Sequence, residues 1–143
     1  MIKNSNTLSN LYCRIVDENI KLISASTGDN KAVTIKDEIK NVYGIFFNYD
    51  NFSNTDEEFC VLSHEYGHCK SGATHKLYSP YQVVEQHEYR ANRAAVYEFL
   101  PLDMIINAFE NGYTEFWQLS EHLDVPESFV RMAVDIYRRE GKL

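Results

Sequence analysis

The stretch from Val61 to Ser71, V-L-S-H-E-Y-G-H-C-K-S, constrains this chain more than any other part of the sequence. Its two histidines, His64 and His68, are four positions apart, so on a helix their imidazoles project from one face, about one turn apart. Both rings can then reach a single Zn²⁺ ion. The spacing therefore predicts a helix with a metal site on one face.

Glu65 directly follows the first histidine and is turned about 100° away from it on a helix. A carboxylate in that place reaches a water bound to the metal more easily than the metal itself. This is the H-E-x-x-H arrangement of zinc hydrolases, with two imidazoles as ligands and a carboxylate as general base. The alternative is an ordinary helix that carries two surface histidines and an exposed glutamate.

A third ligand is expected on the next helix. Residues 79–82, S-P-Y-Q, carry helix start signals, and the helix can run to about Phe99. On this helix Glu88 lies in the middle of a largely apolar stripe, where an unpaired carboxylate would be costly. A zinc ion held by His64 and His68 would supply the missing positive charge.

Asn92 lies one turn after Glu88 and is placed to orient a histidine ligand through a hydrogen bond. The alternative for Glu88 is a structural salt bridge to an arginine, such as Arg14 or Arg131. The predicted site therefore consists of His64, His68 and Glu88 as metal ligands, with Asn92 behind them.

Other residues near the motif are weaker candidates. The alternative candidates for the third ligand are Glu85 and His87. Both point away from the apolar stripe, and the preferred interpretation is that they are surface residues. Cys69 is next to a predicted ligand, but it points about 100° away on a helix, and a buried free thiol is the preferred interpretation. The weak candidates for the group that stabilises the oxyanion are His75, Tyr78 and Tyr81, in the loop between the two helices.

The metal helix has clear start and packing signals. Thr55-Asp56-Glu57-Glu58 is predicted to be a capping box, with Thr55 as N-cap and Glu58 at the third helical position. Gly67 costs about 1 kcal/mol in a helix relative to alanine. Its presence between the two predicted ligands indicates that another segment approaches closely there.

Strands are expected before the metal helix, at 20–25, 32–35 and 42–48. The last of these, V-Y-G-I-F-F-N, is the clearest, because it is rich in aromatic and β-branched residues. Since it comes just before the metal helix, it can be an edge strand that holds an extended substrate by main-chain pairing. The alternative is that it is simply a core strand.

Length and composition fit one soluble globular domain. The 143 residues are 44% hydrophobic and 24% charged, and they suffice to bury a core without disulfides. The three cysteines form no C-x-x-C pair, which argues against a disulfide framework. Because no apolar run approaches a membrane span and the start lacks the apolar core of a signal peptide, a cytoplasmic location is expected.

The net charge of −7 makes non-specific nucleic-acid binding a poor expectation, whereas a basic protein partner would be attracted. Two short helices expected at 115–123 and 126–139 look like a helix-turn-helix. Acidic residues outnumber basic ones from 114 onward, however, which favours a packing subdomain or a protein-recognition surface. We expect a core domain over 1–100 and a C-terminal helical extension over 101–143.

In both parts of the predicted site, the H-E-x-x-H stretch and the segment around Glu88, the chain resembles the ImmA/IrrE family of metallo-endopeptidases. The resemblance rests on G-I-F-F-N, V-L-S-H-E-Y-G-H and E-Y-R-A-N-R-A-A-V-Y-E-F-L-P, in the family's order and spacing, and covers most of 42–143. It implies a compact α+β, zincin-like fold, with a small antiparallel or mixed sheet packed on the H-E-x-x-H helix. The sequence departs from the family pattern at Arg93, where an aromatic or aliphatic residue is commoner.

The resemblance also implies roles for individual residues. His64, His68 and Glu88 would be the Zn²⁺ ligands, and Glu65 the catalytic base. The implied substrate is a helix-turn-helix repressor of a prophage or mobile element. The alternative function is a binding module that grips such a partner without cutting it.

Overall fold

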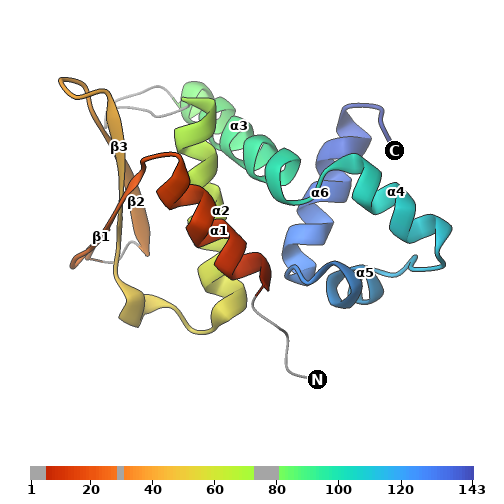
Figure 1. The fold of residues 1–143 in the computed structure, drawn as a ribbon. Helices are drawn as coiled ribbons and strands as arrows, with labels where there is room; N and C mark the ends of the chain where they lie inside the picture. The colour runs from red at the N-terminus through yellow and green to blue at the C-terminus, as the bar shows by residue number, and fades with distance from the viewer. Residues whose placement is uncertain (1–5, 29–30, 73–80) are drawn as a thin grey trace.

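The computed structural model describes residues 6–28, 31–72 and 81–143. Over these residues the fold is α+β, as predicted, with a small mixed sheet beside the paired helices α1 and α2 and a group of helices at the C-terminal end (Figure 1). The elements follow in this order: α1 (Asn6–Asp17), β1 (Lys21–Ser24), β2 (Ala32–Asp37), β3 (Val42–Phe47), the 3₁₀ turn η1 (Tyr49–Asn51), α2 (Thr55–Ser71), α3 (Tyr81–Phe99), α4 (Leu102–Glu110), α5 (Phe116–Leu123) and α6 (Glu127–Arg139).

The sheet has the order β1-β3-β2, with β1 parallel and β2 antiparallel to β3. Ile45 at the middle of β3 lies opposite Leu22 on one side and Thr34 on the other, and it is fully buried. The strand predicted at 42–48 is therefore confirmed, but as the core strand. In the described part of the chain, β3 lies between the two other strands, whereas β2 pairs with β3 alone and so has a free edge on its other side.

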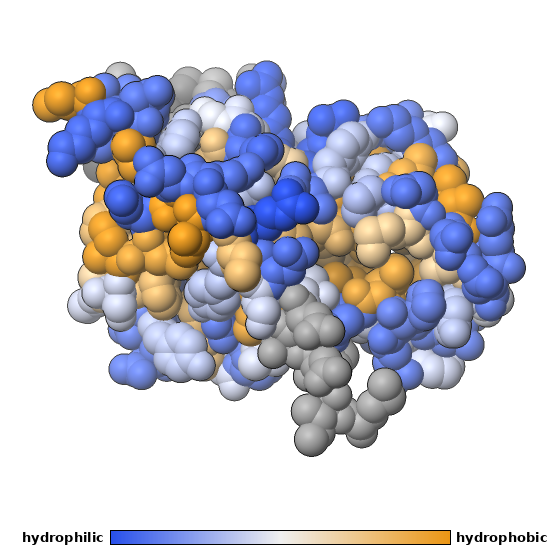
Figure 2. Space-filling view, viewed as in Figure 1, coloured by the Kyte–Doolittle hydropathy of each residue, from blue (hydrophilic) through white to orange (hydrophobic). Residues whose placement is uncertain are grey.

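One face of the sheet packs against helices, and the other is more exposed. Because side chains alternate along a strand, Thr34 faces α2, whereas its neighbour Ile35 lies on the opposite face and is 53% exposed. The space-filling view shows apolar surface over the sheet and over the C-terminal helices, with mostly hydrophilic side chains between (Figure 2). The packing of the sheet on α2 places the hydroxyl of Thr34 on β2 next to Glu65 on α2.

The apolar side of α2 is the one that the sequence predicts. Phe59, Leu62 and Tyr66 are buried, on the side away from the two histidines. Gly72 ends the helix in the left-handed conformation, with φ of 67°, which is the usual role of a glycine after a helix. One side of α2 is thus fixed in the core, while its other side is available for a site.

The start of α2 differs from the prediction by one residue. Asn54, not Thr55, is the N-cap, and its side-chain oxygen accepts a hydrogen bond of 2.8 Å from the backbone N–H of Glu57. Asparagine is at least as good an N-cap as threonine, so the helix begins one position earlier. Glu58 is buried, and the hydroxyl of Tyr12 donates to it at 2.5 Å, which joins α1 to α2.

Helices α2 and α3 cross in close contact at Gly67. A Cβ atom built on this glycine would lie 2.0 Å from the carbonyl oxygen of Ala91 on α3. The expectation that another segment approaches Gly67 closely is therefore confirmed. This crossing sets the distance between the two helices that carry the predicted ligands.

The C-terminal helices share the core with the rest of the chain. The ring of Phe129 on α6 meets that of Phe59 on α2 edge-on, with centroids 5.1 Å apart, and the hydroxyl of Tyr137 donates to the carbonyl of Leu100 at 2.9 Å. Helix α6 therefore contacts both α2 and the end of α3. In the described ranges, every helix is too short or too polar to cross a membrane.

Arg93 joins α3 to the end of α6. Its Nε lies 2.5 Å from Oε1 of Glu140, and its guanidinium stacks 4.1 Å from the ring centroid of Tyr97. The hydroxyl of Tyr97 also donates to Glu140. The hydrogen bond from Tyr97, followed by that from Arg93, lowers the pKa of Glu140 to about 2 against the opposing effect of desolvation.

This carboxylate makes a testable contribution to stability. Because the pKa of Glu140 is lowered on folding, its contribution is fully present above the unfolded value, near 4.5, and is lost as pH falls toward about 2. Glu140→Gln should lower the free energy of unfolding by roughly 1–2 kcal/mol at pH 7. Urea unfolding of both proteins at pH 7, 5 and 3 should show the difference shrinking below pH 4.5. Glu110→Gln, at an exposed site on α4, is the control, and a pH-independent difference would contradict the assignment.

Candidate metal centre

His64 and His68 share one face of α2, as the spacing predicts, on the side away from Phe59, Leu62 and Tyr66. Their Nε2 atoms are 3.1 Å apart, with the two rings nearly perpendicular. His68 is almost fully buried, with 7% of its side chain exposed, whereas His64 is partly open to solvent at 26%. The two imidazoles therefore converge on one point at the edge of the core.

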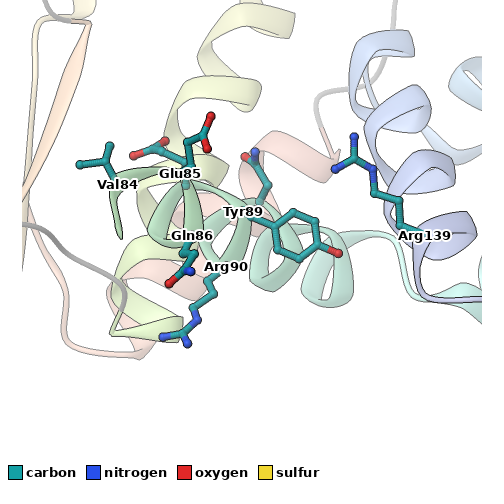
Figure 3. A pocket seen from close by; sticks show the side chains of 8 residues that line it. Val84, Glu85, Gln86, Tyr89, Arg90 and Arg139 are labelled. Atoms are coloured by element: carbon teal, nitrogen blue, oxygen red, sulfur yellow. The ribbon is translucent and has the colours of Figure 1, made fainter. Parts of the chain in front are cut away.

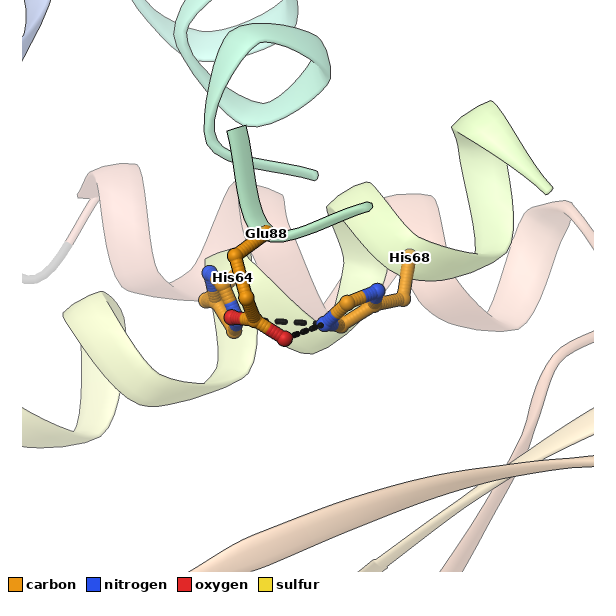
Figure 4. Close-up of side chains that lie close together, drawn as sticks. All are labelled: His64, His68 and Glu88. Atoms are coloured by element: carbon orange, nitrogen blue, oxygen red, sulfur yellow. Dashed lines mark hydrogen bonds and ion pairs between the residues drawn. The ribbon is translucent and has the colours of Figure 1, made fainter. Parts of the chain in front are cut away.

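Glu88 on α3 faces the same point from the other helix (Figure 4). Its Oε2 lies 2.6 Å from Nε2 of His64, and its Oε1 lies 3.1 Å from Nε2 of His68. The alternative partners for Glu88 are occupied elsewhere, since Arg14 pairs with Glu98 and Arg131 with Glu127. The structure thus brings together all three predicted ligands.

Asn92 fixes the orientation of His64. Its Oδ1 lies 2.7 Å from Nδ1 of His64, on the side of the ring away from Glu88. An amide oxygen can only accept a hydrogen bond, so Nδ1 carries the proton and Nε2 carries a lone pair in the neutral ring. The predicted role of Asn92 as an orienting residue agrees with this contact.

The donor atoms fit a metal ion. With its Nδ1–H directed to Asn92, neutral His64 presents a lone pair toward a carboxylate oxygen, and two lone pairs at 2.6 Å repel unless a cation or proton lies between them. Ligands about 2.0–2.1 Å from a tetrahedral Zn²⁺ are about 3.3 Å apart. The observed 2.6–3.1 Å needs a small widening, for which the 40% exposed Glu88 has room.

The chemistry of the donors also agrees with zinc. Two imidazole nitrogens and one carboxylate oxygen are a ligand set that this ion accepts while keeping a further position open. Within residues 6–28, 31–72 and 81–143, His64, His68 and Glu88 are the group of His, Cys, Asp and Glu side chains whose donor atoms all lie within 4.8 Å of one another. The structure therefore contains one candidate metal site over its described part.

The carboxylate of Glu65 is held by the sheet, and Glu65 lines the same cavity as His64. The hydroxyl of Thr34 on β2 donates to Oε2 of Glu65 and lies 3.4 Å from the backbone oxygen of the same residue. This contact fixes the carboxylate between α2 and the edge strand. No pattern in the sequence indicates Thr34, because its role depends on the register of β2 and the packing of the sheet on α2.

Two cavities adjoin the site and share Asn92 in their linings. The first, of about 480 Å³, lies between β2, α2 and α6 and also includes His64 and Glu65. The second, of about 860 Å³, is lined by residues of α3, including Glu88. Arg139 on α6 also lines it (Figure 3). The site is therefore open on both sides, and α6 contributes to both walls.

The weaker candidates lie apart from the cluster. Glu85 is exposed and lines the second cavity, and neither it nor His87 belongs to the donor group. Burial, followed by the nearby Glu65 carboxylate, raises the pKa of the Cys69 thiol to about 12, so this residue stays protonated at neutral pH. All three cysteines are free, as predicted. The loop candidates His75 and Tyr78, and the side chain of Tyr81, fall outside the described residues.

Asn92→Ala tests the orienting contact. Without the Asn92 acceptor, the His64 ring can rotate and exchange tautomers, so we expect zinc affinity to fall by roughly 10–100-fold. Competition with a chromogenic chelator measures this affinity directly. Asn107→Ala, on the exposed side of α4, is the matched control and should bind zinc like the unmodified protein. Equal affinities in the two variants would show that Asn92 does not orient the ligand.

Comparison with protein-family models, with curated proteins and with solved structures yields no match for this chain.

Proposed function

We propose that this protein is a zinc-dependent endopeptidase of the ImmA/IrrE type, with a zincin-like fold. The observation that carries the proposal is the convergence of His64, His68 and Glu88 from two helices, with Glu65 lining the same cavity as His64. A structural zinc site would use four protein ligands, whereas three protein ligands with an open cavity beside them are typical of catalytic zinc. This arrangement supports hydrolysis over a purely structural role for the metal.

The chemistry that Zn²⁺ supplies in such a site is Lewis acidity, which polarises a carbonyl and activates a water. The protein's own contribution is to hold the donors in place. His64 is oriented by Asn92, and His68 is fixed by burial. Glu88 carries the negative charge that offsets part of the charge of the ion.

Glu65 is the residue proposed to move the proton. Its Oε2 accepts the Thr34 hydrogen bond, so Oε1 is the oxygen that remains to take a proton from water and to pass it to the leaving amine. The hydrogen bond from Thr34 keeps the carboxylate from turning away between these two transfers. Two steps of one hydrolysis thus depend on a single positioned side chain.

The free edge of β2 offers a place for the substrate backbone. Over the residues that the structure describes, β2 pairs with β3 on one side only, and its residues Ala32 and Thr34 adjoin the candidate site. An extended peptide can add to such an edge by main-chain hydrogen bonds. The substrate is therefore proposed to be an extended segment of a protein rather than a folded surface.

We propose a helix-turn-helix repressor of a prophage or mobile element as the protein substrate. The net charge of −7 favours encounter with a basic, DNA-binding protein. The same charge disfavours direct contact of this chain with DNA.

The test is incubation of the purified protein with the repressor encoded beside its gene, with zinc and with a chelator. We expect repressor fragments only with zinc, detected by mass spectrometry of the intact products. Stable complex formation without fragments would instead support the non-cleaving binding module. The metal content of protein purified without chelator is the second measurement, and a content near zero would contradict a zinc enzyme.

A further inference from the structure

The wall of the 480 Å³ cavity opposite the metal cluster is made by the C-terminal helix α6. Phe129 and Met132 on α6 line this cavity together with Ala32 on β2 and Val61 on α2. Val61 lies one turn before Glu65 on the same helix, so the apolar part of the cavity begins next to the reactive groups. A helix expected from its sequence to serve packing or protein recognition therefore reaches the candidate active site.

Away from His64 and Glu65, the polar groups of this cavity are neutral or paired. The ammonium of Lys31 at its rim forms an ion pair with Glu57. The Cys60 thiol lies 3.5 Å from the hydroxyl of Ser128, and burial raises its pKa, so it remains a neutral thiol. In this part of the cavity an acidic or basic side chain would find little compensation. The apolar residues of the lining come from β2 (Ala32), α2 (Val61) and α6 (Phe129 and Met132), so an apolar side chain can pack against all three elements.

We propose that this cavity receives an apolar side chain of the substrate, from a residue that flanks the scissile bond, and that Met132 sets the size of the side chain it accepts. The proposal rests on the proposed peptidase function and adds to it the class of substrate residue. Met132 is the suitable residue for this role because it is only partly buried and its unbranched thioether can move with the ligand. Phe129, fully packed against Phe59, forms the fixed end of the cavity.

The experiment is cleavage of a proteome-derived peptide library by the zinc-loaded protein, with cut sites identified by mass spectrometry. We expect one flanking position to be enriched in medium-sized apolar residues such as leucine. Met132→Ala enlarges the cavity and should shift the ratio of tryptophan to leucine at that position by roughly tenfold or more. Val61→Phe narrows the cavity from the α2 side and should shift the preference toward alanine and valine. This second variant keeps the test decisive if the first does not fold.

Two further samples complete the design. Met104→Ala, at an exposed site on α4, removes the same side chain outside the cavity and should keep the original preference. The zinc-loaded Glu65→Gln variant, incubated with the uncut library, reports which peptides bind without relying on hydrolysis. The peptides that this variant retains should show the same apolar enrichment as the cut sites. In the double variant that also carries Met132→Ala, the ratio of tryptophan to leucine among the retained peptides should shift in the same direction as it does at the cut sites.

The outcomes separate the two proposals. Cleavage with a preference that neither Met132→Ala nor Val61→Phe changes would overturn the role of this cavity and leave the peptidase function standing. Absence of cleavage together with selective peptide binding that Met132→Ala shifts would support the cavity and overturn the peptidase function. Absence of both cleavage and selective binding would overturn both proposals.

Discussion

Glu65→Gln is expected to abolish peptide cleavage while the protein keeps its zinc. Glutamine has nearly the same shape and can still pair with the hydroxyl of Thr34, but its amide cannot take up a proton at neutral pH. Loss of a positioned general base costs roughly 10²–10⁴-fold in rate. Because Glu65 is not one of the three proposed ligands, the zinc content should stay at that of the unmodified protein.

The measurement combines the initial rate of cleavage with metal analysis of the same sample. Glu110→Gln, an exposed residue on α4, makes the same chemical change away from the site and should change neither value. A Glu65→Gln variant that cleaves at the original rate would remove this residue from the role of base. A Glu65→Gln variant that has lost its zinc would show that Glu65 is a metal ligand and not only a general base.

The convergence of His64, His68 and Glu88 could be predicted because it follows from local regularities. A spacing of four places His64 and His68 on one helix face wherever that helix lies in the fold. Glu88 could be predicted on energetic grounds, because a carboxylate within an apolar stripe requires a cation. The helical period and the chemistry of the side chains suffice for both predictions. The position of Gly67 between the two ligands indicated the helix crossing in the same way.

The surroundings of the cluster could not be predicted because they depend on tertiary packing. The sequence from 42 to 48 shows a strand but does not show its neighbours, so it could not decide between a core strand and an edge strand. Thr34 reaches Glu65 only because β2 pairs with β3 in one register and the sheet then packs on α2. A shift of one residue would turn Thr34 to the opposite face.

The C-terminal helix shows the same limit. Its apolar period correctly predicts a buried stripe that includes Phe129, but Met132 lies at the margin of that stripe and is only partly buried. No periodicity argument distinguishes a side chain at the border of a core from one that lines a cavity. Helix starts are similarly uncertain by one residue, as Asn54 shows, since adjacent polar residues compete for the same cap.

Gly67→Ala is expected to lower both the stability of the protein and its affinity for zinc. In an isolated helix the substitution would stabilise by about 1 kcal/mol, because alanine is the better helix former. Here, however, the new Cβ would lie 2.0 Å from the carbonyl oxygen of Ala91, 2.7 Å from its carbonyl carbon and 3.1 Å from its Cα. These are backbone atoms of α3, which cannot rotate away as a side chain would, so the two helices must separate.

Separation of α2 and α3 acts directly on the candidate metal centre. Glu88 lies one turn before Ala91 on α3, whereas His64 and His68 are on α2, so the movement increases the distance between the carboxylate and the imidazoles. We expect a net loss of roughly 1–3 kcal/mol in the free energy of unfolding. The zinc affinity should fall by at least about tenfold, as for other changes that displace a ligand.

Urea unfolding of the metal-free protein and chelator competition measure the two effects separately. Gly44→Ala on β3 is the matched control, because a Cβ there would lie 3.5 Å from the ring of Phe46 and 3.8 Å from Cδ1 of Ile23, which is ordinary contact. It should bind zinc normally. A Gly67→Ala protein more stable than the unmodified one, with unchanged zinc affinity, would mean that the helices do not cross as closely as described. A loss of stability alone would mean that Glu88 is not held at the metal by this crossing.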